Sequence, residues 1–313
     1  MQEKLNKLTV FSPAKVNLHL EVKDKRPDGF HDIESVFLAV NFGDTLHFSL
    51  LDASQERDSK VDPSGLIEIS MNGPALKDSG LILSPQRNII YRAITLFREK
   101  TDYFCDKKVI VSAEKRIPIG GGLGGGSSNA ASTLLALNKM APSPLDRSTL
   151  LEMASVLGSD VVFFVYETRA AYVSGRGEII KPFDSPPMFL TLVNPGFSSD
   201  TARAFGLLDK TRSDNFHAKK REESDLNIDI SSMFFTPSCS FKNDFLSVFP
   251  QDEKSIYENI IFLLYKSGAV YANLSGTGAT CFGVFTDEEA AQKAARDLRA
   301  SDSRWLAEFC KTL

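Results

Sequence analysis

The amino-acid sequence predicts an α+β protein made of two domains. Segments in which apolar residues recur at every second position alternate along the chain with segments of helical spacing. A chain of 313 residues corresponds to roughly two domains by the usual relation between length and domain number. The arrangement of the segments changes near Arg169. We therefore expect one domain over residues 1–168 and another over residues 169–313.

The first expected strand has two chemically different faces. Apolar side chains alternate there with polar ones, namely Val16, Leu18, Leu20 and Val22 with Lys15, Asn17, His19 and Glu21. This two-residue period places Lys15 and Asn17 on the same face, where they either act on a ligand or simply face solvent. Further strand-like runs follow at 35–40, 45–50, 66–71 and 109–113.

Three helices are expected in the rest of the first domain. One covers 88–100, one covers 127–140 after a run of glycines, and one covers 148–157. Asp146 or Ser148 is a suitable cap for the third helix, and Gly158 stands just past its end. The apolar, β-branched run 161–166 is expected to be a buried strand.

The second domain begins with strands and ends with a regular alternation. Strands are expected at 170–173, 179–182 and 189–193, and the charged stretch 210–229 is expected to be a solvated insertion or a mobile loop. The last part predicts a helix at 253–267, strands at 270–274 and 281–285 around the loop 275–280, and a helix at 287–300. Two helices beside a pair of strands indicate half of a layered α+β sandwich.

Composition excludes several classes of protein. The net charge of −4 and a pI near 5.7 argue against nucleic acid or an anionic membrane as the main partner. No apolar run approaches the ~20 residues that span a bilayer. Neither the histidines nor the cysteines have the spacing of a metal site. We expect reduced thiols and a cytoplasmic protein. The residues concerned are His19, His31, His47, His217, Cys105, Cys239, Cys281 and Cys310.

The glycine-rich stretch from Pro118 to Ala131 predicts a phosphate-binding loop. Glycine backbones approach a ligand without obstruction by a Cβ atom, and the first N–H groups of the following helix have no partners within the helix. Together with the helix dipole they attract phosphate oxygens. The hydroxyls of Ser127 and Ser128 can donate to the phosphates or approach a nucleotide-bound Mg²⁺. The loop comprises Pro118, Gly120, Gly121, Gly122, Leu123, Gly124, Gly125, Gly126, Ser127 and Ser128.

Two familiar nucleotide motifs fit this stretch poorly. Gly120, Gly122 and Gly125 match the dinucleotide fingerprint by spacing, but residues 115–118 separate the strand from the glycines. The Walker form is absent, because no glycine in the chain precedes a lysine. A glycine loop with a purely structural role is the remaining alternative.

Two further segments are candidates for the same site. Asp160 stands at the end of an expected helix, where it either acts in catalysis or forms a turn or cap. The loop 275–280 is rich in small residues and is either part of the site or a tight hairpin.

In combination, these segments resemble the GHMP small-molecule kinase superfamily. The resemblance rests on Pro-Ala-Lys-Val-Asn at 13–17, on the loop at 118–131 and on Gly-Thr-Gly-Ala at 276–279, in that order. It spans residues 12–285 and extends to Arg-Pro-Asp-Gly-Phe-His at 26–31, Gly43-Asp44, Arg87-Asn88, Gly-Ser-Asp at 158–160 and Asn243-Asp244. These motifs are most similar to the group that phosphorylates a cytidine-diphosphate-linked methylerythritol for non-mevalonate isoprenoid synthesis.

The resemblance implies a fold and an activity. The expected fold is an N-terminal domain like the second domain of ribosomal protein S5 and a ferredoxin-like C-terminal domain. The expected reaction transfers the γ-phosphoryl group of ATP, with Mg²⁺ carried by the nucleotide, to the 2-hydroxyl of the erythritol moiety. The expected partner is this small molecule, and the expected assembly is a monomer or a weak homodimer.

The resemblance also implies roles for individual residues. Asp160 corresponds to the catalytic aspartate and Lys15 to its lysine partner. The glycine loop corresponds to the phosphate loop, and Asn88 and Lys115 to residues near the adenine. The expected substrate-binding residues, with Asp160 among them and His31 reading the cytosine, are Asn17, Phe30, His31, Thr201, Phe205, Gly276, Thr277 and Gly278.

The sequence departs from the family pattern in three places. Phe30 replaces a tyrosine that stacks on the base, which preserves stacking but removes a hydroxyl. Val162 replaces a proline, and the stretch 210–229 is longer than usual. Three alternatives stay open: a superfamily kinase for homoserine, mevalonate or a sugar, a non-catalytic ligand sensor, and a dinucleotide-binding oxidoreductase.

Overall fold

The computed structural model describes residues 5–52, 65–76, 85–214 and 241–313. The chain divides into two compact units, each assembled from separate stretches of sequence. The first unit comprises Met1–Ala14, Gly43–Ile119 and Gly124–Thr168, and the second comprises Lys15–Phe42, Gly120–Leu123 and Arg169–Leu313. The predicted boundary between residues 168 and 169 remains a prediction.

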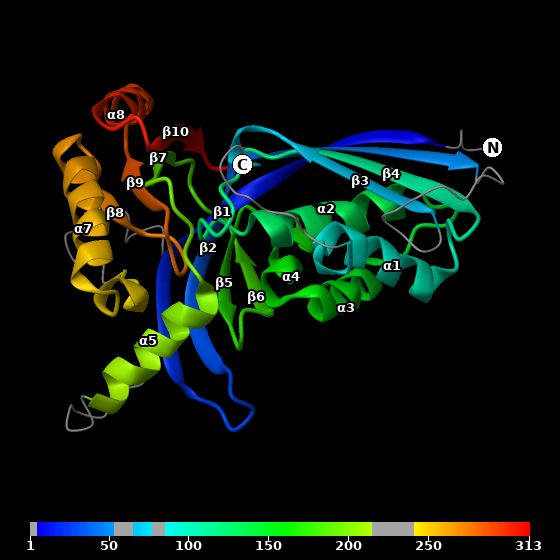
Figure 1. Cartoon of the computed structure of the whole chain (residues 1–313), viewed down its shortest axis with the longest axis horizontal. Helices are drawn as coiled ribbons and strands as arrows, with labels where there is room; N and C mark the ends of the chain where they lie inside the picture. The colour runs from blue at the N-terminus through cyan, green and yellow to red at the C-terminus, as the bar shows by residue number, and fades with distance from the viewer. Residues whose placement is uncertain (1–4, 53–64, 77–84, 215–240) are drawn as a thin grey trace. The chain divides into compact units, whose positions relative to one another are not determined.

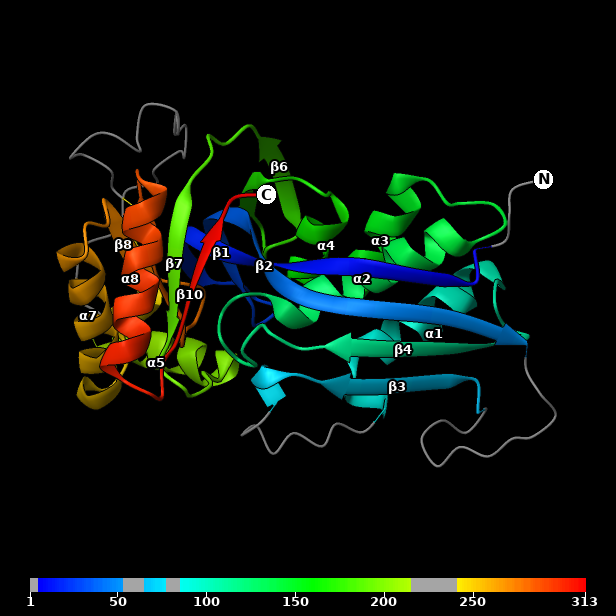
Figure 2. The ribbon, with the colours of Figure 1, turned by 90° about the horizontal axis from the view of Figure 1, so that it is seen from above.

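The first unit is a sheet with helices against it. Its strands are the first part of β1 (Lys7–Lys25), the last part of β2 (His31–Asp52), β3 (Ile67–Asn72) and β4 (Lys107–Glu114). Strand β4 pairs antiparallel with β2, with Thr45 opposite Glu114, and parallel with β3, with Ile67 opposite Val109. The helices α1 (Ile89–Thr101), α2 (Gly125–Met140), α3 (Arg147–Leu157) and α4 (Ser159–Val165) lie on one face of these strands (Figures 1 and 2).

Two helix starts follow from capping chemistry. The side chain of Asn88 accepts a hydrogen bond from the N–H of Ile90 at 2.9 Å and begins α1. The carboxylate of Asp146 accepts from the N–H of Thr149 at 2.8 Å and begins α3. In each case a side-chain oxygen satisfies an N–H group that has no partner within the helix. These helices confirm the predicted ones, and Asp146 rather than Ser148 is the cap.

The expected strand at 161–166 is wrong, because this run forms the helix α4. All five residues from Val161 to Val165 are buried. A short apolar run buried on every side has no period that separates a helix from a strand. Gly158 ends α3 and precedes α4 directly, so Asp160 lies in the first turn of a helix.

The second unit contains two groups of strands. Near the start of β2, Ser35 lies opposite Val173 of β5 (Ala170–Ser174), which pairs in turn with β6 (Ile179–Phe183). A separate antiparallel sheet has the order β10 (Leu306–Lys311), β7 (Phe189–Asn194), β9 (Cys281–Phe285), β8 (Tyr271–Leu274). Helices α7 (Gln251–Lys266) and α8 (Glu288–Ser301) cover one face of it (Figures 1 and 2), which confirms the α+β layer expected there.

Among the described residues of the second unit, three elements have no counterpart among the sequence predictions. They are the strand β10, the helix α5 (Thr201–Asp214) and the short 3₁₀ helix η3 (Asp244–Ser247). Only Ala204 and Leu208 of α5 are buried, so its apolar face is narrow and gives a weak helical period. Lys210 to Asp214 therefore end a helix, whereas the rest of the charged stretch 210–229 lies outside the described residues, as do His217 and Cys239.

The polar face of β1 is enclosed by protein. Lys15, Asn17, His19 and Glu21 are each less than a tenth exposed, which rules out simple solvent exposure of that face. Buried polar groups need partners, and these side chains therefore mark places where other segments must supply hydrogen bonds.

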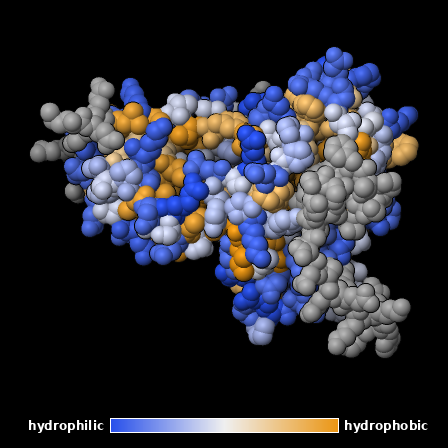
Figure 3. Space-filling model, turned by 180° about the vertical axis from the view of Figure 1, so that it is seen from behind, coloured by the Kyte–Doolittle hydropathy of each residue, from blue (hydrophilic) through white to orange (hydrophobic). Residues whose placement is uncertain are grey.

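The surface is mixed in character. On the face drawn in Figure 3, hydrophobic and hydrophilic residues are interspersed. Cys281 and Cys310 are buried, and burial raises the pKa of both thiols, whereas Cys105 is exposed. None of the described helices has the length and apolar character required to cross a bilayer.

Candidate active site

The second half of the glycine loop forms the start of α2 in the first unit. Gly124 precedes the helix in the left-handed region, with φ of 69°, and none of the described side chains caps this end. The N–H of Ser128 donates to the carbonyl of Gly124 at 2.8 Å. The earlier first-turn N–H groups have no acceptor within the helix by its geometry, and Gly126 is exposed. This helix start is therefore chemically suited to phosphate oxygens.

The two serines of the loop differ in what they offer. The Ser128 side chain is fully buried, and its hydroxyl lies 2.8 Å from the hydroxyl of Ser12. Ser127 is only partly buried. Of the two hydroxyls expected near the phosphates, that of Ser127 is the more accessible.

The first half of the glycine loop packs in the second unit against the loop 275–280. Gly122 has a φ of +74°, and a Cβ atom there would lie 2.1 Å from the carbonyl oxygen of Ser275. The Ser275 hydroxyl donates to the Gly122 carbonyl at 2.9 Å, and the N–H of Thr280 donates to that of Gly121 at 3.1 Å. Here glycine is required by close contact between two backbones. The structure thus joins two segments that the sequence singled out separately.

Lys15 and Asn17 lie beside the same loop. The backbone N–H of Lys15 donates to the carbonyl of Leu123 at 3.0 Å, and that of Asn17 donates to the Ser275 hydroxyl at 3.2 Å. The Lys15 ammonium donates to the Asn17 side-chain oxygen and lies 4.6 Å from the centre of the Phe37 ring. Asn17 is held in turn by a 3.0 Å hydrogen bond to the hydroxyl of Ser35. A buried cation is thereby positioned next to the glycine loop.

Asp160 lies in the first unit, in the first turn of α4. Its side chain is partly buried. A carboxylate in a first turn interacts favourably with the N–H groups and the dipole of the helix.

Lys115 is part of a buried polar cluster in the first unit. Its ammonium forms an ion pair with the fully buried carboxylate of Asp44 and donates to the Asn129 side-chain oxygen at 2.6 Å. Asp44 also accepts from the side chain of Asn129 at 2.9 Å and from the N–H groups of Arg116 and Ile117. Asn88, the other residue expected near the adenine, is engaged as a helix cap. Their contact with adenine remains a prediction, and sequence reasoning quoted Asp44 in a motif without finding its role.

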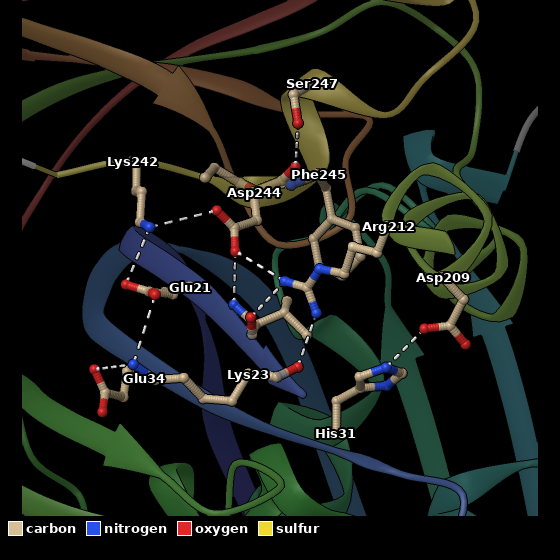
Figure 4. Close-up of polar contacts among 12 residues, drawn as sticks. Glu21, Lys23, His31, Glu34, Asp209, Arg212, Lys242, Asp244, Phe245 and Ser247 are labelled. Carbon is tan, nitrogen blue, oxygen red and sulfur yellow. Dashed lines mark hydrogen bonds and ion pairs between the residues drawn. The ribbon is translucent and has the colours of Figure 1, made fainter. Parts of the chain in front are cut away.

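His31 lies in a second polar cluster, in the second unit, at the start of β2. Its Nε2 atom is 2.8 Å from the Asp209 carboxylate of α5 (Figure 4). Its ring stacks on Phe205 with centroids 5.3 Å apart. The second Asp209 oxygen accepts from the Lys25 ammonium at 2.6 Å. Burial acts to raise the pKa of Asp209, but the hydrogen bonds and charges of Lys25 and His31 outweigh it and lower that pKa. Sequence reasoning found His31 and Phe205 but missed Asp209.

Apart from Asp160 in the first unit, the other expected substrate-binding residues lie in the same unit as His31. Phe30 is 55% exposed, and the Arg176 guanidinium lies 5.0 Å from the centre of its ring. The hydroxyls of Thr201 and Thr277 are 3.3 Å apart, between the start of α5 and the loop 275–280. Gly276 and Gly278 have positive φ in that loop. These residues thus come from three separate stretches of the chain.

An ion-pair network holds the far end of α5. The Arg212 guanidinium donates to the carbonyls of Val22 and Lys23 at 2.6 and 2.8 Å, and lies 3.5 Å from the buried Asp244 carboxylate (Figure 4). Asp244 accepts from the N–H of Val22 at 3.0 Å. The helix that supplies Phe205 and Asp209 is therefore fixed to β1.

Comparison with known proteins identifies the protein family to which this chain belongs. A model of the GHMP kinases N-terminal domain matches residues 88–168, and a model of the GHMP kinases C-terminal domain matches residues 252–303. Together with relatives that align over nine-tenths of the sequence, these matches show that the chain belongs to the GHMP kinase family. Its two-domain GHMP kinase fold and its ATP-dependent kinase chemistry follow, as the motifs predicted.

Individual relatives indicate which kinases of this family the chain is similar to. A 4-diphosphocytidyl-2-C-methyl-D-erythritol kinase of Prochlorococcus marinus (strain AS9601) is 33% identical over 92% of this chain and 88% of its own length. A kinase of the same name from Thermodesulfovibrio yellowstonii is 35% identical over 92% of this chain and 93% of its own length. A crystal structure of 4-(cytidine 5'-diphospho)-2C-methyl-D-erythritol kinase matches with a TM-score of 0.71 and 25% identity, covering 97% of this chain and 99% of that one. A homoserine kinase of Cytophaga hutchinsonii matches in fold, with a TM-score of 0.68 and 16% identity.

Proposed function

We propose that this chain uses ATP to phosphorylate the 2-hydroxyl of 4-diphosphocytidyl-2-C-methyl-D-erythritol, in the non-mevalonate route to isoprenoid precursors. The observation that supports this most is identity of 33–35% to kinases of that name over 92% of the chain. A homoserine, mevalonate or sugar kinase is disfavoured, because the buried His31 beside Phe205 suits an aromatic base rather than a small aliphatic acceptor.

The nucleotide-binding part of the proposal uses the start of α2. The first-turn N–H groups after Gly124 bind the ATP phosphates, and the partly exposed Ser127 adds a hydroxyl. Among the described residues, no group of three or more His, Cys, Asp or Glu side chains could hold a metal ion. Mg²⁺ brought by ATP would be held mainly by the nucleotide's own phosphates beside the Ser127 hydroxyl, and it would neutralise charge on the transferring group.

For the phosphoryl-transfer step, the proposal gives one role to each of two residues. Asp160 accepts the proton of the substrate hydroxyl and orients that oxygen in line with the γ-phosphorus. Lys15 supplies positive charge to the transferring phosphoryl oxygens, held by Asn17 and the Phe37 ring in a conformation that needs little rearrangement. Most of the rate enhancement then comes from position and charge, as this reaction class requires.

The pyrimidine-binding part of the proposal uses the cluster around His31. Phe30 offers an exposed ring face to the base, Phe205 lies on the other side of the pocket, and His31 meets the edge of the base. A protein site built on hydrogen bonds to one base discriminates strongly against a base that cannot form them. We expect a cytidine substrate to be preferred over the uridine analogue.

The experiment is a coupled assay of ADP release with the cytidine-linked substrate, homoserine, mevalonate and galactose in parallel. Asp160→Asn should lose about 10²–10⁴-fold in kcat with ATP affinity preserved. Asp106→Asn, the same change at an exposed turn residue of the same unit, should have no effect. Turnover of homoserine in preference to the cytidine substrate would refute the proposed substrate. Near-normal kcat in Asp160→Asn would refute the role of that aspartate.

The setting of the enzyme is a further part of the proposal. We place it in the cytoplasm as a monomer or a weak homodimer. The wide spacing of the four cysteines along the sequence supports the cytoplasmic setting. Sedimentation velocity over a range of concentrations measures the assembly directly.

A further inference from the structure

The contact between His31 and Asp209 determines which atom of the imidazole is available to a ligand. Asp209 lies on α5 and His31 at the start of β2, and Figure 4 shows the carboxylate pointing at the ring. Asp209 Oδ1 and His31 Nε2 are 2.8 Å apart, and the His31 side chain is only 4% exposed. The bond is therefore short, and its His31 end is shielded from water while the Asp209 side chain is 30% exposed.

Asp209 is an acceptor in this contact. Its other oxygen accepts from Lys25 at 2.6 Å, and this cation keeps the carboxylate ionised. An ionised carboxylate has no proton to donate. The proton in the contact must therefore belong to Nε2, so that in the neutral imidazole Nδ1 is left as an acceptor.

The orientation of the ring is fixed as well. Phe205 stacks on it at an interplanar angle of 25°, and Phe205 is itself held edge-on by Phe245, with centroids 4.9 Å apart. None of the described residues forms a hydrogen bond with Nδ1. That nitrogen is therefore the one polar atom of the ring left for a ligand within this part of the structure.

The helix that supplies Asp209 is anchored close by. Arg212, less than one turn further along α5, binds the carbonyls of Val22 and Lys23 and lies beside Asp244 (Figure 4). Lys25, on the same strand β1, holds Asp209 itself. Two contacts with one strand therefore define where the carboxylate stands relative to His31.

The two pyrimidines differ in the groups that an acceptor can use. The exocyclic amino group of cytosine donates, whereas the oxygen at the same position of uracil only accepts. We propose that Asp209 is a positioning residue for base selection: by binding the Nε2 proton it makes His31 Nδ1 an acceptor for the cytosine amino group and repels the uracil oxygen. This inference rests on the proposed function, because it takes His31 to face the pyrimidine.

The most informative variant is Asp209→Asn. Lys25 can only donate, so the new amide turns its oxygen toward Lys25 and its N–H toward His31. The proton of the neutral ring then moves to Nδ1, which becomes a donor. Asp214→Asn makes the same charge change on α5 at an exposed position and is the matched control. Asp209→Glu restores an acceptor and should recover most of the wild-type behaviour.

The first measurement is of the ring itself, without any ligand. Nitrogen-15 NMR of the full-length protein at pH 8, with His31→Gln to assign the signal, should show a protonated Nε2 and a bare Nδ1. Asp209→Asn should reverse the two. A wild-type ring with a bare Nε2, or with protons on both nitrogens, would overturn the proposal whatever the substrate is.

The second measurement is the ratio of affinities for cytidine 5′-monophosphate and uridine 5′-monophosphate, by calorimetry. Asp209→Asn should lower this ratio about 10–100-fold, the effect of leaving one buried polar pair unmatched. KM for the cytidine substrate should rise while kcat stays near wild type. An unchanged ratio despite a reversed tautomer would refute the role in selection. Failure of the wild type to bind either nucleotide would instead refute the proposed function and leave the tautomer result standing.

Discussion

The Asp44 carboxylate of the first unit and the His31 imidazole of the second are both buried, yet they use their hydrogen-bonding capacity differently. Asp44 accepts from the side chains of Lys115 and Asn129 and from two backbone N–H groups. Both of its oxygens are occupied. His31 has one nitrogen bound by Asp209, whereas no described residue binds the other. One cluster is closed by the protein, and the other leaves an atom to bind.

This difference separates two kinds of motif residue. Lys115 and Asn88 match positions near adenine in the family motif, and here Lys115 forms an ion pair while the side-chain oxygen of Asn88 caps a helix. His31 matches a base-reading position, and the protein leaves part of its polar chemistry unused. A motif residue satisfied by its own protein contributes to folding, whereas one with an unused donor or acceptor is available to a ligand.

The largest effect expected from this comparison is that of Asp44→Asn. The change leaves the buried Lys115 ammonium without a counter-charge, and breaking such a pair costs about 3–5 kcal/mol of the free energy of unfolding. Urea unfolding measures it. His31→Gln, the counterpart in the open cluster, should change that free energy far less and should raise KM for the cytidine substrate. Near-normal stability of Asp44→Asn together with a raised KM for ATP would show that Lys115 serves the nucleotide.

A second prediction concerns His19, which lies in the second unit with a buried Nε2 atom for which the described residues provide no hydrogen bond. Burial lowers its pKa from 6.5 to about 4. Between pH 6.5 and about pH 4 the unfolded chain binds a proton at this histidine that the folded chain does not. The free energy of unfolding therefore falls as the pH falls. The full effect is about 3 kcal/mol below pH 4, and about 2 kcal/mol is already lost at pH 5.

The measurement is urea unfolding at pH 7.5 and pH 5. The loss of stability on acidification should be about 2 kcal/mol smaller in His19→Gln than in the wild type. His47→Gln, at an exposed histidine, is the control and should lose as much as the wild type. Equal losses in all three proteins would mean that His19 takes up its proton over the same pH range in the folded and the unfolded chain.

Much of the fold could be predicted because its signals are local. Asn88 and Asp146 cap helices where the sequence placed helix starts, and the period-2 runs became strands. The runs 35–40 and 45–50 proved to be one strand, β2, because nothing in a local pattern distinguishes a continuous strand from two. The run at 161–166 was assigned wrongly, since uniform burial in α4 removes the period that identifies a helix.

The site was predictable only where residues belong to a contiguous motif. The glycine loop, Lys15 and His31 stand in such motifs, and resemblance supplied their roles. Asp209 is 178 positions from His31 in sequence, and its helix α5 has a weak apolar period, so no local pattern joins the two residues. The same holds for the loop 275–280, whose contact with Gly122 emerges only from the tertiary fold.

The smallest expected effect is a change in KM, and it comes from comparing alanine variants of two buried serines, Ser12 and Ser35. The Ser12 hydroxyl bonds to Ser128 and Asn129 in the closed cluster of the first unit, whereas Ser35 donates to the His19 carbonyl and accepts from Asn17 in the second. Replacement of either by alanine removes comparable hydrogen bonds and should cost about 1 kcal/mol of the free energy of unfolding. Only Ser35→Ala releases a residue expected to bind substrate. Steady-state kinetics should therefore show KM for the cytidine substrate raised a few-fold in Ser35→Ala and unchanged in Ser12→Ala. Equal KM values in the two variants would show that the hydrogen bond between Ser35 and Asn17 serves stability alone.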